Sequence, residues 1–141
     1  MKDFIRKVSY HETDKMGITH HSNYIKWMEE ARIDFLDQIG YGYAEMEKQG
    51  IISPVIAVEC KYKHSTTFDD RVKIEVSVES LSATKLTIEY LMTNNVTGEV
   101  VLTGRSMHCF IDKAGRPIAL KKHFPDFDKA LREQIKETKE N

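Results

Sequence analysis

The chain has few residues that cross-link or interrupt a fold, with two cysteines and three prolines among its 141 residues. Cys60 and Cys109 form no Cys-x-x-Cys pair, so neither a disulfide framework nor a zinc ribbon is indicated. No apolar run approaches the roughly 20 residues that a membrane-spanning helix needs, and the start, MKDFIRKV, does not resemble a signal peptide. We therefore expect a soluble protein of a reducing cytoplasm, without membrane insertion.

A strong charge of one sign is also lacking, because the formal net charge is -1 and acidic and basic residues are interspersed. This balance gives no support for nucleic-acid binding and favours small-molecule chemistry. The hydrophobic content of 40% is ordinary for a globular protein, and the chain shows no linker, repeat or low-complexity segment. We expect one domain over residues 1–141.

The clearest predicted element is an amphipathic helix that ends at Gly40. Its apolar residues recur at spacings of three and four: Tyr24, Trp27, Met28, Ala31, Phe35 and Ile39. A short second helix is predicted over Tyr43–Lys48, and a helical tail over Phe127–Asn141.

The rest of the chain is rich in β-branched residues, which favour strands. The strands predicted are Phe4–Tyr10, Ile51–Tyr62, Arg71–Ser80, Lys85–Thr93 and Val100–Ile111. The turns at Phe68–Asp70, Ser82–Thr84 and Asn94–Gly98 are short enough to join neighbouring antiparallel strands. One helix against one antiparallel sheet makes this an α+β domain.

A polar turn leads directly into the predicted first helix. Asp14 lies in this turn, Gly17 gives it conformational freedom, and Ser22 and Asn23 have side-chain oxygens suited to capping the helix. The free N–H groups of a helix's first turn can hold an oxygen that is becoming an anion. A carboxylate beside such donors indicates a candidate active site.

The same segment resembles the hotdog-fold acyl-CoA thioesterases of the 4-hydroxybenzoyl-CoA thioesterase and YbgC-like family. The pattern that carries the resemblance consists of Tyr10, Thr13, Asp14, Gly17, His21, Asn23, Tyr24, Glu30, Ala31 and Arg32. Weaker matches follow at Tyr62 with Asp69 and Asp70, and at Gly115-Arg116-Pro117. Ser65 stands where the family usually has proline, which puts local strand geometry or substrate contacts in question more than the reaction.

The resemblance implies a sheet of five to six antiparallel strands wrapped around a long central helix, and hydrolysis of an acyl-CoA to free acid and CoA. It implies that Asp14 acts as nucleophile or general base, two roles that the sequence does not separate. His21 would supply its backbone N–H as an oxyanion donor, or its imidazole as an orienting group. Tyr10 would bond the acid or shape the acyl pocket, with a buried, satisfied tyrosine as the structural alternative.

Candidates for substrate contact are Gly17, His20, Asn23 and Tyr24. Structural roles remain alternatives: a local or pocket-lining role for His20 and helix capping for Asn23. The six histidines match no zinc spacing, so no metal site and no cofactor are expected.

The family resemblance also implies a homo-oligomer, a dimer or a homotetramer, because hotdog domains pair their sheets edge to edge. The acyl group stays open among short or medium aliphatic and aromatic groups. The donor is either coenzyme A or an acyl carrier protein, which would make the chain an acyl-carrier-protein thioesterase. A hotdog dehydratase or isomerase is disfavoured by the spacing of Tyr10, Asp14 and His21, and a non-catalytic module that binds acyl-CoA or acyl carrier protein is the alternative of another class.

Overall fold

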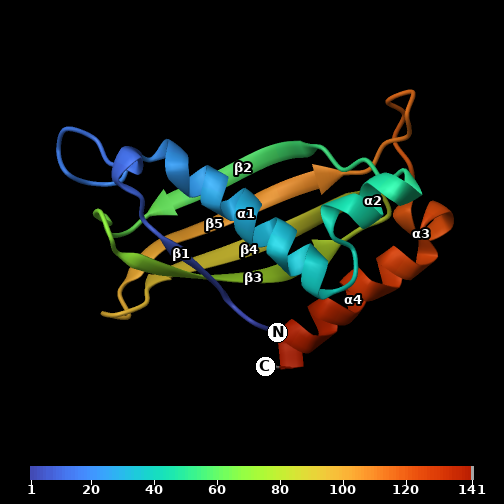
Figure 1. Ribbon diagram of the computed structural model, residues 1–141. Coiled ribbons are helices and arrows are strands. Elements are labelled where there is room, and N and C mark those ends of the chain that lie inside the picture. Colours follow the sequence, from blue (N-terminus) through green and yellow to red (C-terminus); the bar gives the residue numbers. More distant parts are fainter. Residues whose placement is uncertain (141) are drawn as a thin grey trace. The chain divides into compact units, whose positions relative to one another are not determined.

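The computed structural model describes the backbone of residues 1–140 and the side chains of residues 1–135. Its elements are labelled in Figure 1. In chain order they are β1 (Phe4–Lys7), the 3₁₀ turn η1 (Tyr10–Glu12), α1 (Ser22–Gln38), α2 (Tyr43–Gln49), β2 (Val55–Tyr62), β3 (Arg71–Leu81), β4 (Lys85–Asn94), β5 (Val100–Cys109), α3 (Leu120–His123) and α4 (Pro125–Glu140).

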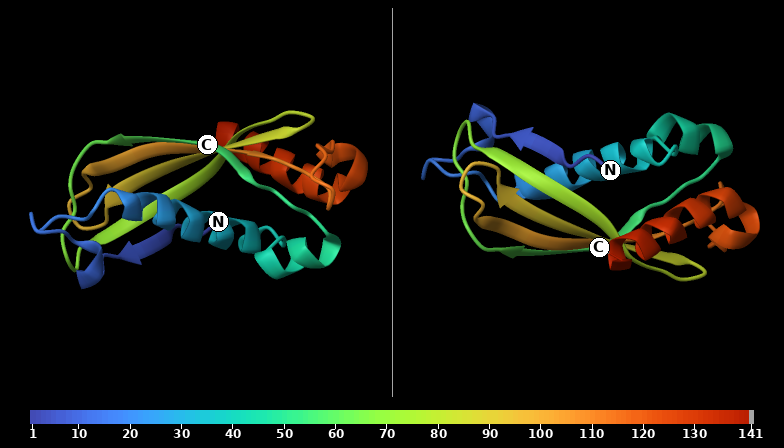
Figure 2. Two further views of the ribbon diagram at one scale, coloured as in Figure 1. Left: turned by 90° about the horizontal axis from the view of Figure 1, so that it is seen from above. Right: turned by 90° about the horizontal axis from the view of Figure 1, so that it is seen from below.

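Over these residues the strands form one five-stranded sheet in the order β1-β3-β4-β5-β2. β1 and β3 are antiparallel, with Phe4 opposite Ile74 and Lys7 opposite Arg71. Figure 2 gives two further views of the same elements. An antiparallel sheet accompanied by helices confirms the predicted α+β class.

The chain divides into two compact units, which are described separately. The first contains residues 1–35, 60–76 and 90–104. Its core forms where the apolar face of α1 meets strand residues, as the helical spacing predicts. The buried residues of this core are Val8, Tyr24, Trp27, Met28, Ala31, Phe35, Val72, Ile74, Tyr90, Met92, Val101 and Leu102.

The second unit contains residues 36–59, 77–89 and 105–141. Here α3 packs against α4, and the ring of Phe127 stacks on Tyr41 with centroids 4.5 Å apart. Buried Asp128 accepts a hydrogen bond from the Arg132 guanidinium, Nε to Oδ1, at 2.7 Å. This unit therefore has its own apolar core and its own ion pair with a buried carboxylate.

Most predicted elements agree with the structure, and α1 ends near Gly40, whose φ of 90° stops a helix. β2 begins at Val55 rather than Ile51, because Pro54 has no N–H to donate to a ladder. α4 covers most of the predicted helical tail, and Asn141 lies outside the described residues. The sequence did not predict α3.

Two strand predictions were wrong. The first strand ends at Lys7 instead of Tyr10, because the Ser9 N–H donates to the Glu12 carboxylate at 2.8 Å and the chain turns into η1. The strands on either side of Phe68–Asp70 are not neighbours, since β2 lies beside β5 and β3 lies between β1 and β4. The segment that joins them pairs instead with the Asp14 turn, through an antiparallel bridge between Thr67 and Ile18.

Candidate active site

Asp14 lies in a tight hairpin between η1 and α1. Thr13 and Thr19 form an antiparallel bridge, and the Asp14 N–H donates to the Ile18 carbonyl at 2.9 Å. The Gly17 N–H donates back to the Asp14 carbonyl at 2.9 Å, and Gly17 has a φ of 80°, which a residue with a side chain rarely adopts. The hairpin thus holds the backbone of Asp14 from both sides.

The Asp14 side chain is half-buried and only one of its oxygens is engaged. Oδ1 accepts a hydrogen bond from the Met16 N–H at 2.8 Å, as aspartate does in tight turns. Within the described residues, Oδ2 accepts no hydrogen bond. The carboxylate is therefore oriented by the turn while one oxygen stays available to a reactant.

The start of α1 lies directly after this hairpin. The Ser22 N–H points to Nδ1 of His20 at 3.3 Å, and the Asn23 N–H donates to the His20 carbonyl at 3.0 Å. In the described part of the chain, the His21 N–H donates no hydrogen bond. An unpaired N–H at the positive end of a helix dipole is a donor for a developing oxyanion.

The rings of His20 and His21 are both exposed and stack on each other, with centroids 4.4 Å apart. His21 also meets Tyr62 edge to face, with centroids 6.3 Å apart. Burial raises the pKa of Tyr62, and the neighbouring Cys60 and Tyr24 raise it further, so its hydroxyl is neutral at physiological pH. Two imidazoles and one phenol thus lie at the first turn of α1.

Asn23 and Tyr24 are buried beside the site, and their side chains hold its segments together through hydrogen bonds. The Asn23 amide donates to the carbonyls of Glu12 at 3.0 Å and His20 at 3.2 Å, instead of capping the helix through its oxygen. The Tyr24 hydroxyl lies 2.9 Å from Oγ1 of Thr66, which lies 2.7 Å from Oγ1 of Thr19. These bonds attach the end of the hairpin to α1 and to the segment before β3.

Tyr10 differs from two of its expected roles, the bond to Asp14 and the buried tyrosine, while a role in shaping the acyl pocket stays a prediction. Its side chain is 77% exposed, so it is not a buried tyrosine, and its hydroxyl makes no hydrogen bond to Asp14. The ring meets Phe68 edge to face, with centroids 5.7 Å apart. The backbone turn at η1 carries Tyr10 outward, since its carbonyl accepts hydrogen bonds from the Thr13 N–H and hydroxyl.

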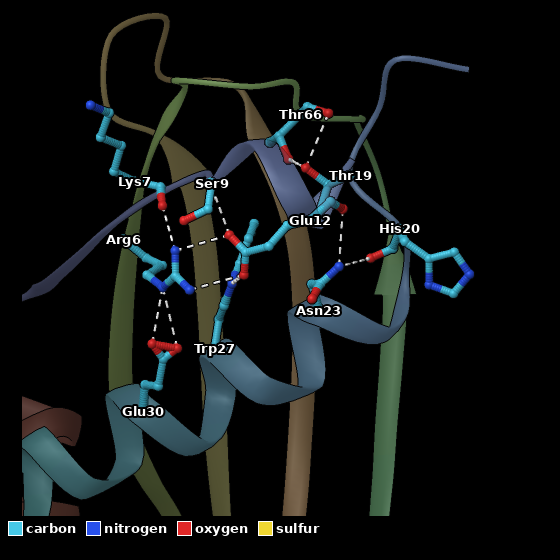
Figure 3. Close-up of polar contacts among 10 residues, drawn as sticks. All are labelled: Arg6, Lys7, Ser9, Glu12, Thr19, His20, Asn23, Trp27, Glu30 and Thr66. Carbon is cyan, nitrogen blue, oxygen red and sulfur yellow. Dashed lines mark hydrogen bonds and ion pairs between the residues drawn. The ribbon is translucent and has the colours of Figure 1, made fainter. Parts of the chain in front are cut away.

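The sequence analysis did not predict the polar cluster of Arg6, Glu12, Trp27 and Glu30, in which Glu12 and Trp27 are buried (Figure 3). The Arg6 guanidinium donates to both Glu12 oxygens, at 3.0 and 2.9 Å, and its Nε donates to Glu30 at 3.0 Å. Nε1 of Trp27 donates to Glu12 Oε2 at 2.8 Å, and the guanidinium lies 5.5 Å from the indole centroid. The one available signal was the charge of Arg6 within a predicted strand, because a charge on a face that becomes buried needs a partner.

The Glu12 carboxylate is buried and charged. Burial by itself would raise its pKa, but hydrogen bonds from the Ser9 N–H and the Trp27 indole, together with the charge and hydrogen bonds of Arg6, hold that pKa below its usual value. Since Ser9, Trp27 and Arg6 all donate hydrogen bonds to the ionised form, Glu12 is a fixed anion at neutral pH. Its charge is balanced by Arg6.

Cys60 and Cys109 are both free thiols, and no three His, Cys, Asp or Glu side chains among the described residues could together hold a metal ion. No helix in the described chain is both long enough and apolar enough to cross a membrane. At the start of α1 the described residues present a carboxylate, backbone donors and aromatic rings.

Comparisons with known proteins identify the family of this chain. The sequence matches the thioesterase-like superfamily over residues 8–135. It is 34% identical over 125 residues to "Putative acyl-CoA thioesterase YneP" of Bacillus subtilis (strain 168), covering 88% of this chain and 90% of that protein. Among solved structures it is similar to the DHNA-CoA thioesterase of Staphylococcus aureus, with 38% identity, a TM-score of 0.87, and coverage of 93% of this chain and 88% of that one.

A second solved structure, BH1999 gentisyl-coenzyme A thioesterase, is 26% identical with a TM-score of 0.79, covering 92% of this chain and 98% of that one. The family match covers both compact units, and two of the relatives are more than 30% identical to this chain. These findings confirm the resemblance drawn from the segment Tyr10 to Arg32. The chain belongs to the thioesterase-like superfamily.

Proposed function

We propose that this chain hydrolyses the thioester of an acyl-CoA, with Asp14 as the reacting carboxylate and the His21 N–H as the oxyanion donor. One observation carries the proposal: an oriented carboxylate with a free oxygen lies in the hairpin that leads into α1, and an unpaired N–H lies at the start of that long helix. The His20 N–H donates to the Glu12 carbonyl at 2.8 Å, which holds the residue before His21 against the residue two positions before Asp14. Family membership supports thioester hydrolysis as the class of reaction.

As general base, Asp14 takes a proton from water while the water oxygen attacks the thioester carbonyl carbon. The carbonyl oxygen becomes an anion that the His21 N–H stabilises. The carbon–sulfur bond then breaks, the CoA thiolate leaves, and the free acid is released.

As nucleophile, a carboxylate oxygen of Asp14 attacks the same carbon directly and expels the thiolate, forming a mixed anhydride that water hydrolyses. The two routes can be distinguished by a single turnover in ¹⁸O-water. The general-base route places the ¹⁸O of water only in the product acid. The nucleophilic route places ¹⁸O in Asp14 when water opens the anhydride at the aspartyl carbon, and mass spectrometry of the Asp14 peptide detects that label.

The acyl group proposed first is aromatic, because two relatives are named for a dihydroxynaphthoyl and a gentisyl thioester. The exposed rings of Tyr10, Phe68 and Tyr62 offer faces on which a planar acyl group could stack. In this proposal Gly17 and His20 line the entrance from the hairpin and the helix start, while buried Asn23 and Tyr24 shape the site without touching the reacting atoms. Short and medium aliphatic acyl groups are the competing substrates.

We further propose a single hotdog domain over residues 1–141, with α1 as its central helix. The family match runs without a break across both compact units. Within the first unit, α1 contacts two different strands: Met28 Sδ lies 3.6 Å from Cys60 Sγ on β2, and Arg32 donates to the Tyr90 hydroxyl on β4 at 3.1 Å. A helix in contact with separate strands of one sheet is what a wrapped sheet requires.

The proposed assembly is a homo-oligomer, a dimer or a tetramer, in which β2 pairs with the same strand of a second copy. β2 is an edge strand, and Val55, Ile56 and Val58 on it are each more than 40% exposed. A long apolar edge is normally covered, since it presents unpaired backbone groups and apolar side chains to water. The cytoplasm is the proposed compartment, because both cysteines are free thiols.

The test is release of free thiol from a panel of acyl-CoAs that runs from acetyl to palmitoyl and includes 4-hydroxybenzoyl, phenylacetyl and 1,4-dihydroxy-2-naphthoyl. Wild type is compared with Asp14→Asn and Asp14→Ala, and with Asp126→Asn, an exposed aspartate on α4, as the matched control. We expect both Asp14 variants to lose at least about 100-fold in kcat while melting temperature and mass stay unchanged. Wild type that binds one of these thioesters without releasing thiol would instead indicate a binding module or a carrier-protein substrate.

A further inference from the structure

The buried carboxylate of Glu12 contacts three separate parts of the first compact unit. Its oxygens accept hydrogen bonds from the Ser9 N–H at 2.8 Å, from the Arg6 guanidinium of β1 at 3.0 and 2.9 Å, and from the Trp27 indole of α1 at 2.8 Å. Glu12 itself is only 3% exposed. The side chain therefore joins β1, the η1 turn and α1 at one point (Figure 3).

The backbone of the same residue contacts the start of α1 a second time. The Glu12 carbonyl accepts hydrogen bonds from the His20 N–H at 2.8 Å and from the Asn23 amide at 3.0 Å. His20 immediately precedes the unpaired His21 N–H, and Asp14 lies two residues after Glu12. Glu12 thus lies in one of the hydrogen-bonded connections between the hairpin of Asp14 and the start of α1 that carries the proposed oxyanion donor.

We propose that Glu12 is a positioning residue for the hydrolysis: its side chain, anchored to β1 and α1, fixes the Asp14 hairpin against the helix start that carries the His21 N–H. This inference rests on the proposed function, because it assigns Glu12 a role at that same site. Glu12 acts through Asp14 and His21, and it has no role in proton transfer.

A purely structural ion pair is the competing explanation, and the second unit offers a matched case. Asp128 is also 3% exposed and also bonded to an arginine, Arg132, on α4. Neutralising either buried carboxylate removes the charge that its partly exposed arginine pairs with. Only Glu12 is bonded to the residues that hold the reacting groups, so only Glu12 should change the chemical step.

The experiment compares Glu12→Gln with Asp128→Asn, at a temperature where both are folded, using the acyl-CoA that wild type hydrolyses fastest. Because a shift of about 1 Å in reacting groups can cost about 100-fold in rate, we expect Glu12→Gln to lower kcat by about 10- to 100-fold with KM changed by less than about threefold. Asp128→Asn should keep wild-type kcat per folded molecule. Equal kcat values in the two variants would overturn the proposal.

A double variant separates positioning from a loss of folded protein. Because part of the Glu12 effect acts through Asp14, adding Glu12→Gln to Asp14→Asn should lower the residual rate by a smaller factor than Glu12→Gln lowers the wild-type rate. A loss in the double variant as large as in Glu12→Gln alone contradicts the proposal. Should Glu12→Gln not fold, Trp27→Phe removes a single donor from Glu12, and we expect it to lower kcat by about 3- to 10-fold by a smaller displacement.

A spectroscopic signal tests the contact without relying on activity. Trp27 is the only tryptophan, so its indole N–H gives one resonance in a ¹H–¹⁵N spectrum of the whole protein. That resonance should move in Glu12→Gln and stay in place in Asp128→Asn; an indole that does not respond to Glu12→Gln refutes the anchoring contact.

Failure of the proposed function and failure of the positioning role give different results. If wild type releases no thiol, the proposed function fails, and the positioning role fails with it. If wild type is active and kcat is unchanged in Glu12→Gln, the positioning role alone is refuted.

Discussion

Removing Arg6 is expected to destabilise the protein strongly and in a pH-dependent way. In Arg6→Met the Glu12 carboxylate keeps the Ser9 and Trp27 donors but loses its buried cation and two charged hydrogen bonds, at 3.0 and 2.9 Å. Breaking a buried ion pair by removing one partner costs about 3 to 5 kcal/mol of unfolding free energy. The lost bond to Glu30 adds at most about 1 kcal/mol, because that pair is partly exposed to solvent.

The pH dependence follows from the pKa of Glu12. In wild type that pKa is held below its usual value, so its stabilising effect is present above the unfolded pKa of about 4.3 and is lost as the pH falls through the folded value. Without Arg6 the folded pKa rises, because burial is opposed by fewer donors. The difference in unfolding free energy between Arg6→Met and wild type should therefore be largest at neutral pH and shrink as the pH falls through the interval between the two folded pKa values.

Urea unfolding at pH 7 and again near pH 4.5 measures both effects. Lys7→Met is the control, since Lys7 also lies on β1 but pairs with Asp69 in an exposed ion pair at 2.9 Å, and it should leave the unfolding free energy unchanged within error. A destabilisation of Arg6→Met below about 1 kcal/mol, or one that grows as the pH falls, would refute the reasoning, because neither fits a buried and charged Glu12.

Two further outcomes are expected. Thr66→Val, which keeps the shape of the side chain, should cost about 1 to 3 kcal/mol in urea unfolding, because it leaves the buried hydroxyls of Tyr24 and Thr19 with one partner fewer; a neutral effect would mean that these hydroxyls have other partners. Val58→Lys on the β2 edge should lower the mass measured by light scattering toward that of one chain, whereas Val96→Lys, at a position that is 85% exposed in the β4–β5 turn, should not. An oligomer that survives Val58→Lys does not assemble through this edge.

Local pattern was sufficient for much of the fold. The spacing of apolar residues from Tyr24 to Ile39 predicted α1, and runs of β-branched residues predicted β3, β4 and β5 to within two residues at each end. These predictions succeeded because a helix or strand that buries one face has apolar residues at a regular spacing along the sequence. The position of β2 beside β5 could not be predicted from a short turn, since strand order depends on which faces are buried together.

The sequence likewise identified some residues of the candidate site and missed others. The family pattern identified Asp14 and the start of α1, and the structure gives both a geometry that suits their proposed roles. The outward position of Tyr10 and the donor role of Asn23 were missed, because both follow from backbone turns whose partners lie elsewhere in the chain. Glu12 was missed for the same reason, although it lies two residues before Asp14.

The sequence by itself determined the class of fold, the amphipathic helix, and the acid-and-helix motif that connects this chain to the thioesterase-like superfamily. These features depend on residues that are close in the chain, so their signal survives in a linear pattern. Only the tertiary structure decided that Glu12 is buried and charged, because its partners Arg6 and Trp27 come from a strand and a helix on either side of it. A buried charge is stable only where folding brings its donors together, and that arrangement exists in three dimensions alone.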